Sequence, residues 1–221
     1  MGTNNSKQIY EAMKATIATV LVLLFLMNGA NAQKKGNHEV SFGLGITFPN
    51  EESPLNIPGE SALSGAVVGS GVYRFYVAEL LSVGVRAFLT SSKLTDYLVT
   101  QEGGASPTKV DFTLTSFNAG LESALLLSSH RTYKPFLVIL LLYSEGSLSN
   151  DQLGSLKYTG YLAGGGVGMR MTVSDRVALS AEGVGLFGTA HWKTHPAKNS
   201  TGTEFNPSSL RAVLSISFTL K

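Results

Sequence analysis

The sequence predicts an all-β fold, an eight-stranded antiparallel up-and-down transmembrane β-barrel. Three observations predict it. Apolar residues alternate with small or polar residues over long stretches, and the links between these stretches are alternately short and long. Only 14% of the 221 residues are charged, whereas a typical soluble domain has about 25%. Alternation indicates strands with two different faces, and short turns opposite long loops are typical of a barrel that crosses an outer membrane.

The first 32 residues are expected to be a cleaved signal peptide. Lys7 and Lys14 precede an apolar run over residues 15–27, and Ala30-Asn31-Ala32 has the small-residue pattern of a cleavage site. The run is shorter than the roughly 20 residues that a membrane-spanning helix needs. Cleavage after Ala32 leaves residues 33–221 as a single barrel domain.

The eight strands follow in the rest of the chain. In the first, residues 40–48, Val40, Phe42 and Leu44 begin an apolar face that alternates with serine, glycine and threonine. The last strand repeats this pattern over residues 209–220. The expected strands between them lie at 65–77, 81–90, 109–125, 134–144, 158–173 and 177–188.

The links divide into two kinds according to length. Short links are expected at 78–80, 126–133 and 174–176, and long links at 49–64, 91–108, 145–157 and 189–207. Two of the hairpins, residues 72–83 and 168–179, also align without gaps. Each has an arginine, Arg74 or Arg170, four residues before a small residue and an acidic residue. We therefore expect the same local geometry in both hairpins.

The second face of the strands consists of glycine, serine, threonine and alanine with a few arginines and glutamates. Such a face suits a narrow lumen, because eight strands enclose a space just wide enough for side chains to fill. The apolar face would then meet lipid, and no open pore is expected. Aromatic residues are expected in two belts. One belt lies near the short turns (Tyr73, Phe75, Tyr133, Phe136 and Phe218), and the other near the long loops (Phe48, Phe112, Tyr143, Phe187 and Trp192).

With these features the chain resembles the small outer-membrane β-barrel family of OmpX/OmpA type over residues 38–220. The resemblance rests on the architecture and on the terminal strand that ends Ile216-Ser217-Phe218-Thr219-Leu220-Lys221. It implies a place in the outer membrane of a Gram-negative cell envelope, contact with outer-membrane lipid, and recognition of the last strand by the barrel assembly machinery. The family usually closes that strand with an aromatic residue, whereas this chain ends in Lys221.

The candidate site is a charge network inside the lumen. Alternation puts Arg74, Arg86, Arg170, Glu182 and Arg211 on the small-residue face, and Glu122 joins them if its strand shifts phase near Thr115 and Ser116. Buried charges need partners. Mirror symmetry about the short turns predicts that Arg170 faces Glu182 and that Arg74 faces Arg86, so Glu122 is expected to supply the counter-charge. We expect this network to lock the barrel, and a gate or proton path is the alternative.

Other motifs carry little chemistry. His191 and His195 lie in the last long link without a third ligand nearby, so no metal is predicted. Residues 164–168 are glycine-rich, but they lie within an alternating strand and lack the lysine and helix of a phosphate-binding loop. The absence of cysteine excludes thiol and iron-sulfur chemistry, and a net charge of +2 argues against nucleic acid as a partner. We expect no catalytic residue and no cofactor.

The sequence therefore predicts a monomeric, non-enzymatic outer-membrane protein with a lumen filled by side chains. Its structural or surface-interaction role would be carried by the long outer loops, which would hold any surface ligand. Two alternatives remain open. One is a lipid-modifying barrel enzyme of the outer membrane, and the other is a soluble secreted β-barrel that binds a small ligand.

Overall fold

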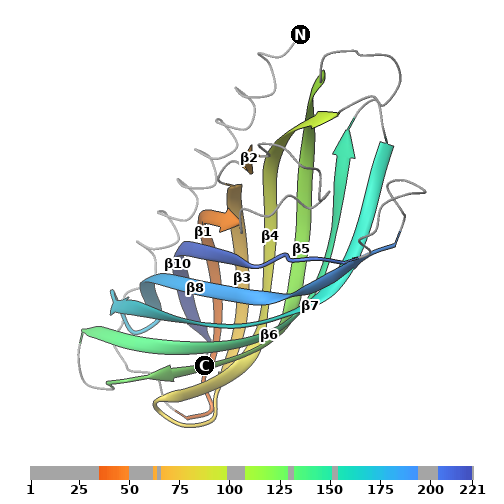
Figure 1. Ribbon diagram of the computed structural model, residues 1–221. Helices are drawn as coiled ribbons and strands as arrows, with labels where there is room; N and C mark the ends of the chain where they lie inside the picture. Colours follow the sequence, from red (N-terminus) through yellow and green to blue (C-terminus); the bar gives the residue numbers. More distant parts are fainter. Residues whose placement is uncertain are drawn as a thin grey trace.

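The computed structural model describes residues 35–49, 62–63, 66–98, 108–128, 132–150, 154–193 and 204–220, and the structural statements below concern these residues. The predicted signal peptide and cleavage site lie outside them. Ten strands form one sheet (Figure 1). The eight long strands are β1 (His38–Pro49), β3 (Ala66–Tyr76), β4 (Leu81–Leu98), β5 (Thr108–Leu126), β6 (Tyr133–Asn150), β7 (Gly154–Thr172), β8 (Val177–Trp192) and β10 (Ser209–Leu220). The two-residue strands β2 (Ala62–Leu63) and β9 (Glu204–Phe205) pair with β4 and β8.

The sheet closes into a barrel. Every long strand pairs antiparallel with its neighbours along the chain, and β10 pairs with both β1 and β8. Closure leaves no long strand with an unpaired edge, which removes the aggregation hazard of an open sheet. The predicted eight-stranded antiparallel barrel is confirmed. In the described part of the chain, no helix is long and apolar enough to cross a membrane.

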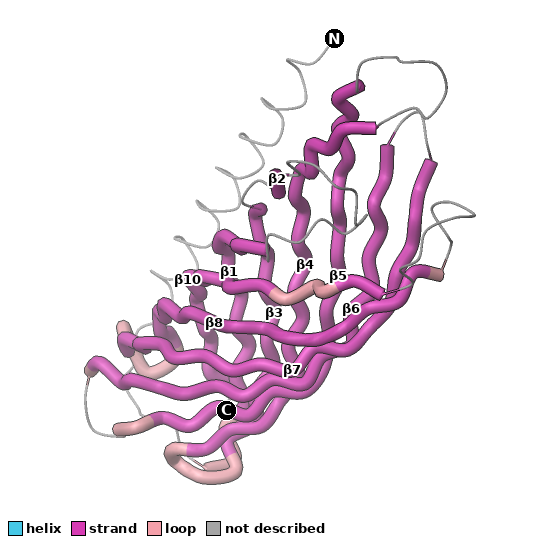
Figure 2. The backbone as a smooth tube through the Cα atoms, viewed as in Figure 1, coloured by secondary structure: helices cyan, strands magenta, loops and turns pink. Residues whose placement is uncertain are grey.

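The wall of the barrel is higher on one side. β4, β5, β6 and β7 have 18 or 19 residues, whereas β1, β3 and β10 have 11 or 12. Figures 1 and 2 show the long strands rising beyond the short ones at the long-loop end. The predicted links 91–108 and 145–157 are therefore largely wrong, because β4–β5 pairing continues to Leu98 and Thr108 and β6–β7 pairing to Asn150 and Gly154. Main-chain hydrogen bonds hold these extensions together although their outward residues are polar.

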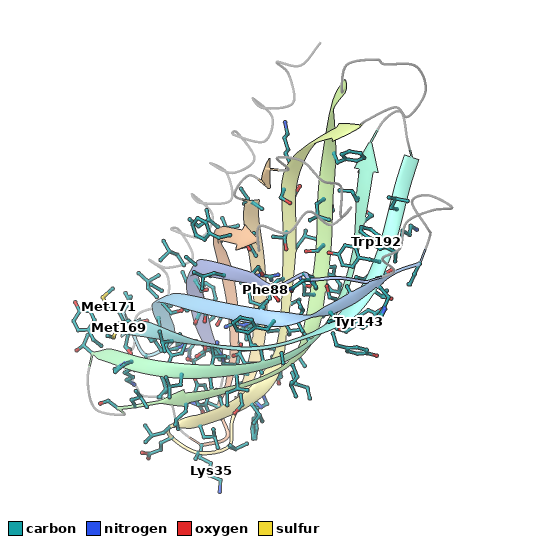
Figure 3. The ribbon with its side chains drawn as sticks, in the orientation of Figure 1. Lys35, Phe88, Tyr143, Met169, Met171 and Trp192 are labelled. Carbon is teal, nitrogen blue, oxygen red and sulfur yellow. The ribbon has the colours of Figure 1, made fainter. Side chains whose placement is uncertain are left out.

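The two faces of the wall differ as the sequence predicted. Outward-facing apolar side chains such as Leu44, Ile139 and Leu214 are 59%, 66% and 69% exposed, while the side chains between them are buried. In Figure 3, Phe88 lies within the barrel and Tyr143 projects from its outer surface. A closed barrel with its apolar face outward is the reverse of a soluble protein, in which the apolar face forms the core.

β5 keeps one phase throughout. Its inward-facing positions, buried or partly buried, recur at every second residue from Phe112 and Leu114 to Glu122 and Leu126. The predicted phase shift near Thr115 and Ser116 is wrong, because the apolar residues at the outer end of β5 face the interior rather than the surroundings. Glu122 lies inside the barrel without any shift.

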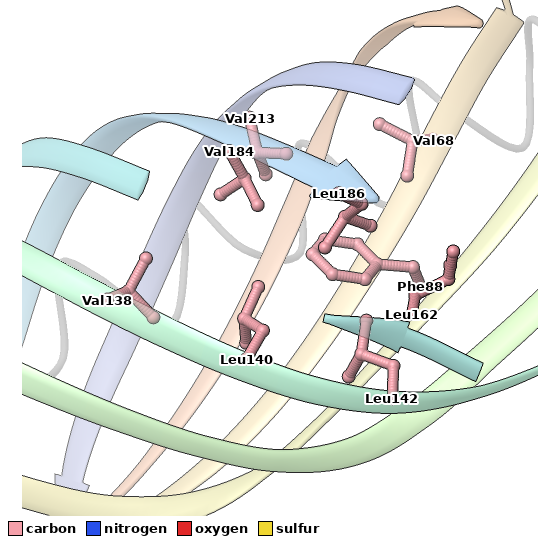
Figure 4. Packing of buried hydrophobic residues seen from close by; sticks show 9 residues of the cluster. All are labelled: Val68, Phe88, Val138, Leu140, Leu142, Leu162, Val184, Leu186 and Val213. Carbon is pink, nitrogen blue, oxygen red and sulfur yellow. The ribbon is translucent and has the colours of Figure 1, made fainter. Parts of the chain in front are cut away.

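An apolar layer fills the middle of the lumen (Figure 4). It consists of Val68, Phe88, Val138, Leu140, Leu142, Leu162, Val184, Leu186 and Val213, each at most 2% exposed. β6 contributes Val138, Leu140 and Leu142 to this layer, so the inward side chains of this strand, which is apolar on both faces, pack in the lumen.

Glycines on β7 give this layer room. A Cβ atom at Gly164 or Gly166 would collide with the carbonyl oxygen of Gly185 or Gly183 on β8. The glycine-rich segment 164–168 is thus part of a strand, as predicted, and its inward positions have no space for a side chain.

The two similar hairpins have the same turn. Val77 and Ala78 donate their amide hydrogens to the carbonyl oxygen of Leu81 at 3.0 and 3.1 Å, and Leu81 donates to Ala78 at 3.3 Å. In the second hairpin Val173 and Ser174 donate to Val177 at 2.9 and 3.0 Å, and Val177 donates to Ser174 at 3.3 Å. The gap-free alignment of the two segments therefore correctly predicted a repeated geometry.

The aromatic belts agree only in part with the sequence prediction. Tyr73, Phe75 and Tyr133 face outward near the short turns, and Phe48, Tyr143 and Phe187 face outward near the long loops. Three of the expected members, Phe136, Phe112 and Trp192, instead point inward, into the clusters at the two ends of the lumen. Phe117 and Tyr161, which are 49% and 75% exposed, complete the outer belt.

Candidate functional site

Six buried side chains of alternating charge form a chain of ion pairs across the lumen. In order of contact they are Arg170, Glu39, Arg74, Glu122, Arg86 and Glu182. They come from β7, β1, β3, β5, β4 and β8, so six of the eight long strands contribute one residue each. The charges of the three arginines and three glutamates cancel. This set is called the lumenal charge network below.

Glu39 is the most heavily contacted carboxylate of the network. Arg170 forms two contacts with this carboxylate, a hydrogen bond from Nη1 to Oε1 at 2.8 Å and an ion pair between Nη2 and Oε2 at 2.7 Å. Arg74 Nη1 donates to Oε1 at 3.1 Å, Tyr76 Oη donates to Oε2 at 3.1 Å, and Ser41 Oγ donates to Oε1 at 3.2 Å. These donors fill the acceptor positions of the carboxylate, which is what a fully buried charge requires.

Glu122 and Glu182 hold the other end of the network. Glu122 lies between Arg74 and Arg86 and pairs with the Nε atom of each. The guanidinium group of Arg86 also binds Glu182, with Nη1 donating to Oε1 at 2.6 Å and Nη2 donating to Oε2 at 3.1 Å. A bidentate arginine–carboxylate pair fixes both orientation and distance. Arg86 on β4 thereby reaches the opposite wall, because four strand steps separate β4 from β8 in either direction around the closed sheet.

The pairing differs from the mirror symmetry expected of the hairpins. Arg74 lies opposite Gly84 and Arg170 opposite Ser180, two residues away from the predicted partners Arg86 and Glu182. The expectation that Arg170 faces Glu182 is wrong, because each turn is centred one residue earlier than assumed. Arg170 instead reaches Glu39, and Glu182 receives Arg86.

Sequence reasoning missed Glu39. The first strand was expected to begin at Val40, and Glu39 precedes it by one position, whereas β1 begins at His38. Extending the alternation of Ser41, Gly43 and Gly45 back by one step would have placed Glu39 on the inner face. A charged residue at a strand end is ambiguous in sequence, since it can equally end the strand in solvent.

The network has little free space and no group suited to proton transfer. A cavity of about 10 Å³ beside Arg74, Tyr76 and Arg170 has room for about one water molecule. Each carboxylate in the network is bound by arginine, and guanidinium groups stay protonated in proteins. The arrangement therefore supports a fixed set of ion pairs that holds the strands together better than a proton relay, whose groups must gain and lose protons.

The remaining candidates lie elsewhere. Arg211 faces the lumen but is outside the network, and it lies over the Phe88 ring of the apolar layer. His191 is exposed near the outer end of β8, and its predicted companion His195 lies outside the described residues. Among the described side chains, no group of three or more histidine, aspartate or glutamate residues could hold a metal ion.

Comparison with known proteins supports the fold alone. No protein-family model matches the sequence, and a search of curated proteins finds no match. The crystal structure of the outer membrane protein OprG from Pseudomonas aeruginosa is similar, with a TM-score of 0.60 over 86% of this chain and 99% of that chain at 10% sequence identity. Ail, the attachment invasion locus protein of Yersinia pestis, gives a TM-score of 0.47 over 84% of this chain and 99% of that chain at 8% identity. The likeness to OprG confirms the fold of a small outer-membrane β-barrel.

Proposed function

We propose that this protein is an integral outer-membrane barrel of non-enzymatic type, closed along its axis, which presents its long loops at the cell surface. The lumenal charge network would lock the wall from inside. The role of the protein would then be structural or one of surface interaction. One observation carries the proposal, namely the belt of apolar side chains on the outer face of a closed barrel.

The height of that belt matches a membrane. On β6, Tyr133 and Tyr143 are both exposed and bracket the outward side chains of Leu137, Ile139 and Leu141. Ten residue steps separate the two tyrosines. At about 3.3 Å per residue and a tilt of about 40°, this corresponds to roughly 25 Å, the height of the apolar band of outer-membrane barrels. The same face would aggregate in water.

The interior supports a closed barrel rather than a channel. The apolar layer fills the middle, and the lumenal charge network ties opposite walls together on the side of the short turns. Specific binding then has to depend on the segments that join the strands at the long-loop end, as is usual for loops carried by a rigid scaffold.

Fractionation tests the membrane assignment. The protein should stay in the membrane pellet after carbonate extraction, and an unboiled sample should migrate faster on a detergent gel than a boiled one because the barrel remains folded. Recovery in the aqueous fraction would favour the soluble secreted alternative and contradict the proposal.

Two further measurements test the closed, non-enzymatic character. Purified protein in planar bilayers should produce no conductance steps, and stable steps would show an open pore instead. Deletion of the gene should leave the acylation pattern of membrane lipids unchanged, and a specific change that the intact gene restores would support the lipid-modifying enzyme.

A further inference from the structure

We propose that Arg211, together with the hydroxyl groups of Thr47 and Ser70, binds a small monovalent anion, chloride or a carboxylate group, in the outer part of the lumen. This site is separate from the lumenal charge network. The proposal starts from a buried cation that has no counter-charge among the described residues.

Arg211 differs from the other three lumenal arginines. Arg74, Arg86 and Arg170 each form at least one ion pair with a glutamate, whereas Arg211 forms none within the described part of the chain. It is only 3% exposed. Its Nε donates to Ser209 Oγ at 3.3 Å, and its Nη1 atom is buried without a hydrogen-bond partner. Such an unpaired charge is costly in a low-dielectric interior.

The aromatic ring beneath Arg211 compensates this charge only in part. The guanidinium carbon of Arg211 lies 4.6 Å from the centroid of the Phe88 ring. The guanidinium carbon of Arg86 lies 5.2 Å from the same centroid, so two cations share one ring. A cation–π contact is weaker than an ion pair. An anion is the partner that Arg211 lacks.

Two hydroxyl groups without partners lie in the same part of the lumen. Thr47 is opposite Arg211 in the β1–β10 ladder, and Ser70 is opposite Phe88 in the β3–β4 ladder. Both hydroxyl oxygens are buried and have no hydrogen-bond partner. Buried polar groups that lack partners commonly mark an ion or a water molecule. A hydroxyl can donate to an anion, so Thr47 and Ser70 suit the same ligand as Arg211.

The site lies near the long-loop ends of β1 and β10. Arg211 is the third residue of β10, and Thr47 is close to the end of β1. Val68 on β3 and Val213 on β10, both members of the apolar layer, are inward-facing neighbours of Ser70 and Arg211 along their strands. One guanidinium favours a single negative charge.

The test uses the mature barrel refolded in a neutral detergent. Its urea unfolding midpoint is measured at constant ionic strength while chloride or acetate replaces the bulkier gluconate ion. Chloride or acetate should raise the midpoint of the parent, because a ligand that binds only the folded state stabilises it. Arg211→Met, which can still pack on Phe88, should abolish the increase. The control Arg176→Gln, in an exposed turn, should keep it.

The hydroxyl groups are tested with nearly isosteric changes. Thr47→Val and Ser70→Ala should each weaken anion binding by about threefold to tenfold, the effect of losing one hydrogen bond. Broadening of the ³⁵Cl nuclear magnetic resonance line by the parent and by Arg176→Gln, but not by the Thr47→Val/Ser70→Ala double variant, provides a direct readout that does not depend on Arg211→Met folding.

Three results would overturn the proposal. The first is a parent whose midpoint and ³⁵Cl line do not depend on the anion. The second is an Arg211→Met variant that is as strongly destabilised in gluconate as Glu122→Ala, because Arg211 would then have a carboxylate partner within the chain. An anion response retained by Arg211→Met would assign the ion to a different site.

Discussion

Two of the three carboxylates in the lumenal charge network each bind arginines from two other strands. Glu39 and Glu122 each pair with two arginines, and Glu182 accepts both arms of Arg86. Removing a carboxylate would therefore leave a buried positive charge without a partner. The resulting loss of folding free energy is larger than the net contribution of the ion pair itself. The energetic importance of each glutamate follows from the number of cations that depend on it.

Glu122→Ala should lower the free energy of unfolding by about 3–5 kcal/mol, because Arg74 loses one of its two carboxylates and Arg86 loses the nearer of its own. The temperature at which the unboiled gel band shifts to the boiled position should fall accordingly. Glu145→Ala is the matched control. That glutamate is half exposed and pairs with Lys193 at 3.6 Å, so its loss should cost about 0–1 kcal/mol. Equal effects of the two changes would contradict a stabilising network.

Glycines offer a second test at the residue scale. Gly166→Ala should destabilise the barrel by about 1–3 kcal/mol, because the new methyl group would meet the Gly183 carbonyl and the side chain of Val184. Gly183→Ala should change stability by less than about 0.5 kcal/mol, since nothing lies within 4 Å of its added Cβ. Urea unfolding in detergent measures both. Tolerance of alanine at Gly166 would mean that the lumen is looser than the structure indicates.

At the scale of elements, the β3–β4 and β7–β8 hairpins act as equivalent units. Their turns share the same three main-chain hydrogen bonds, and Arg74 and Arg170 occupy corresponding inward positions. Both arginines reach Glu39, one from each side. The repeated hairpin therefore places two cations on a single carboxylate.

The two turns should be interchangeable. Replacing residues 77–81 with the sequence of residues 173–177 should leave the unfolding free energy within about 0.5 kcal/mol of the parent, because the main-chain geometry is the same and the replaced side chains are exposed or only partly buried. Heat modifiability and urea unfolding measure the outcome.

Inserting one glycine after Glu79 in the same turn serves as the contrasting variant. A shift of one residue moves every following side chain of the strand to the other face, so Arg86 would point outward. This variant should fail to form the compact unboiled band. A large loss of stability on exchanging the turns would show that the resemblance between the hairpins is superficial.

At the scale of the whole molecule, the barrel is layered along its axis. The lumenal charge network lies toward the short turns and the apolar layer lies in the middle, where Arg211 and its neighbouring hydroxyl groups border it. The outer surface has its own order, with an apolar band between two sets of aromatic residues. We propose that the outer band sets the position of the barrel in a membrane.

The proposed membrane position can be tested by its depth dependence. Ile139 lies near the middle of the segment between Tyr133 and Tyr143. Ile139→Arg should lower the free energy of unfolding by about 2–4 kcal/mol, as charged residues do at the bilayer midplane. Ser147→Arg, four residues beyond Tyr143 on the same face, should cost about 0–1 kcal/mol. Urea unfolding from lipid vesicles measures both variants. Equal costs would contradict the proposed placement of the band.

Much of the fold could be predicted from alternation, because the period of two in the sequence is the period of a strand. The alternation of Leu137, Ile139 and Leu141 with Val138, Leu140 and Leu142 required two apolar faces, and the structure places one on the outer surface and the other in the lumen. The outer ends of β4–β8 were less predictable. Their continuation depends on main-chain pairing, which leaves little trace in the side chains.

The sequence by itself determined the number of long strands, the face on which most strand side chains lie and the similarity of two hairpins, because these are local properties of alternation and turn chemistry. Only the tertiary structure decided which charges meet. Arg86 reaches Glu182 across the lumen and Arg170 reaches Glu39 three strand steps away, while Arg211 is left without a described carboxylate. Closure of the sheet brings together strands that are distant in the chain, and a two-residue difference in hairpin register is enough to change the residues opposite Arg74 and Arg170. The predicted role of Glu122 as the counter-charge for Arg74 and Arg86 agrees with the ion pairs.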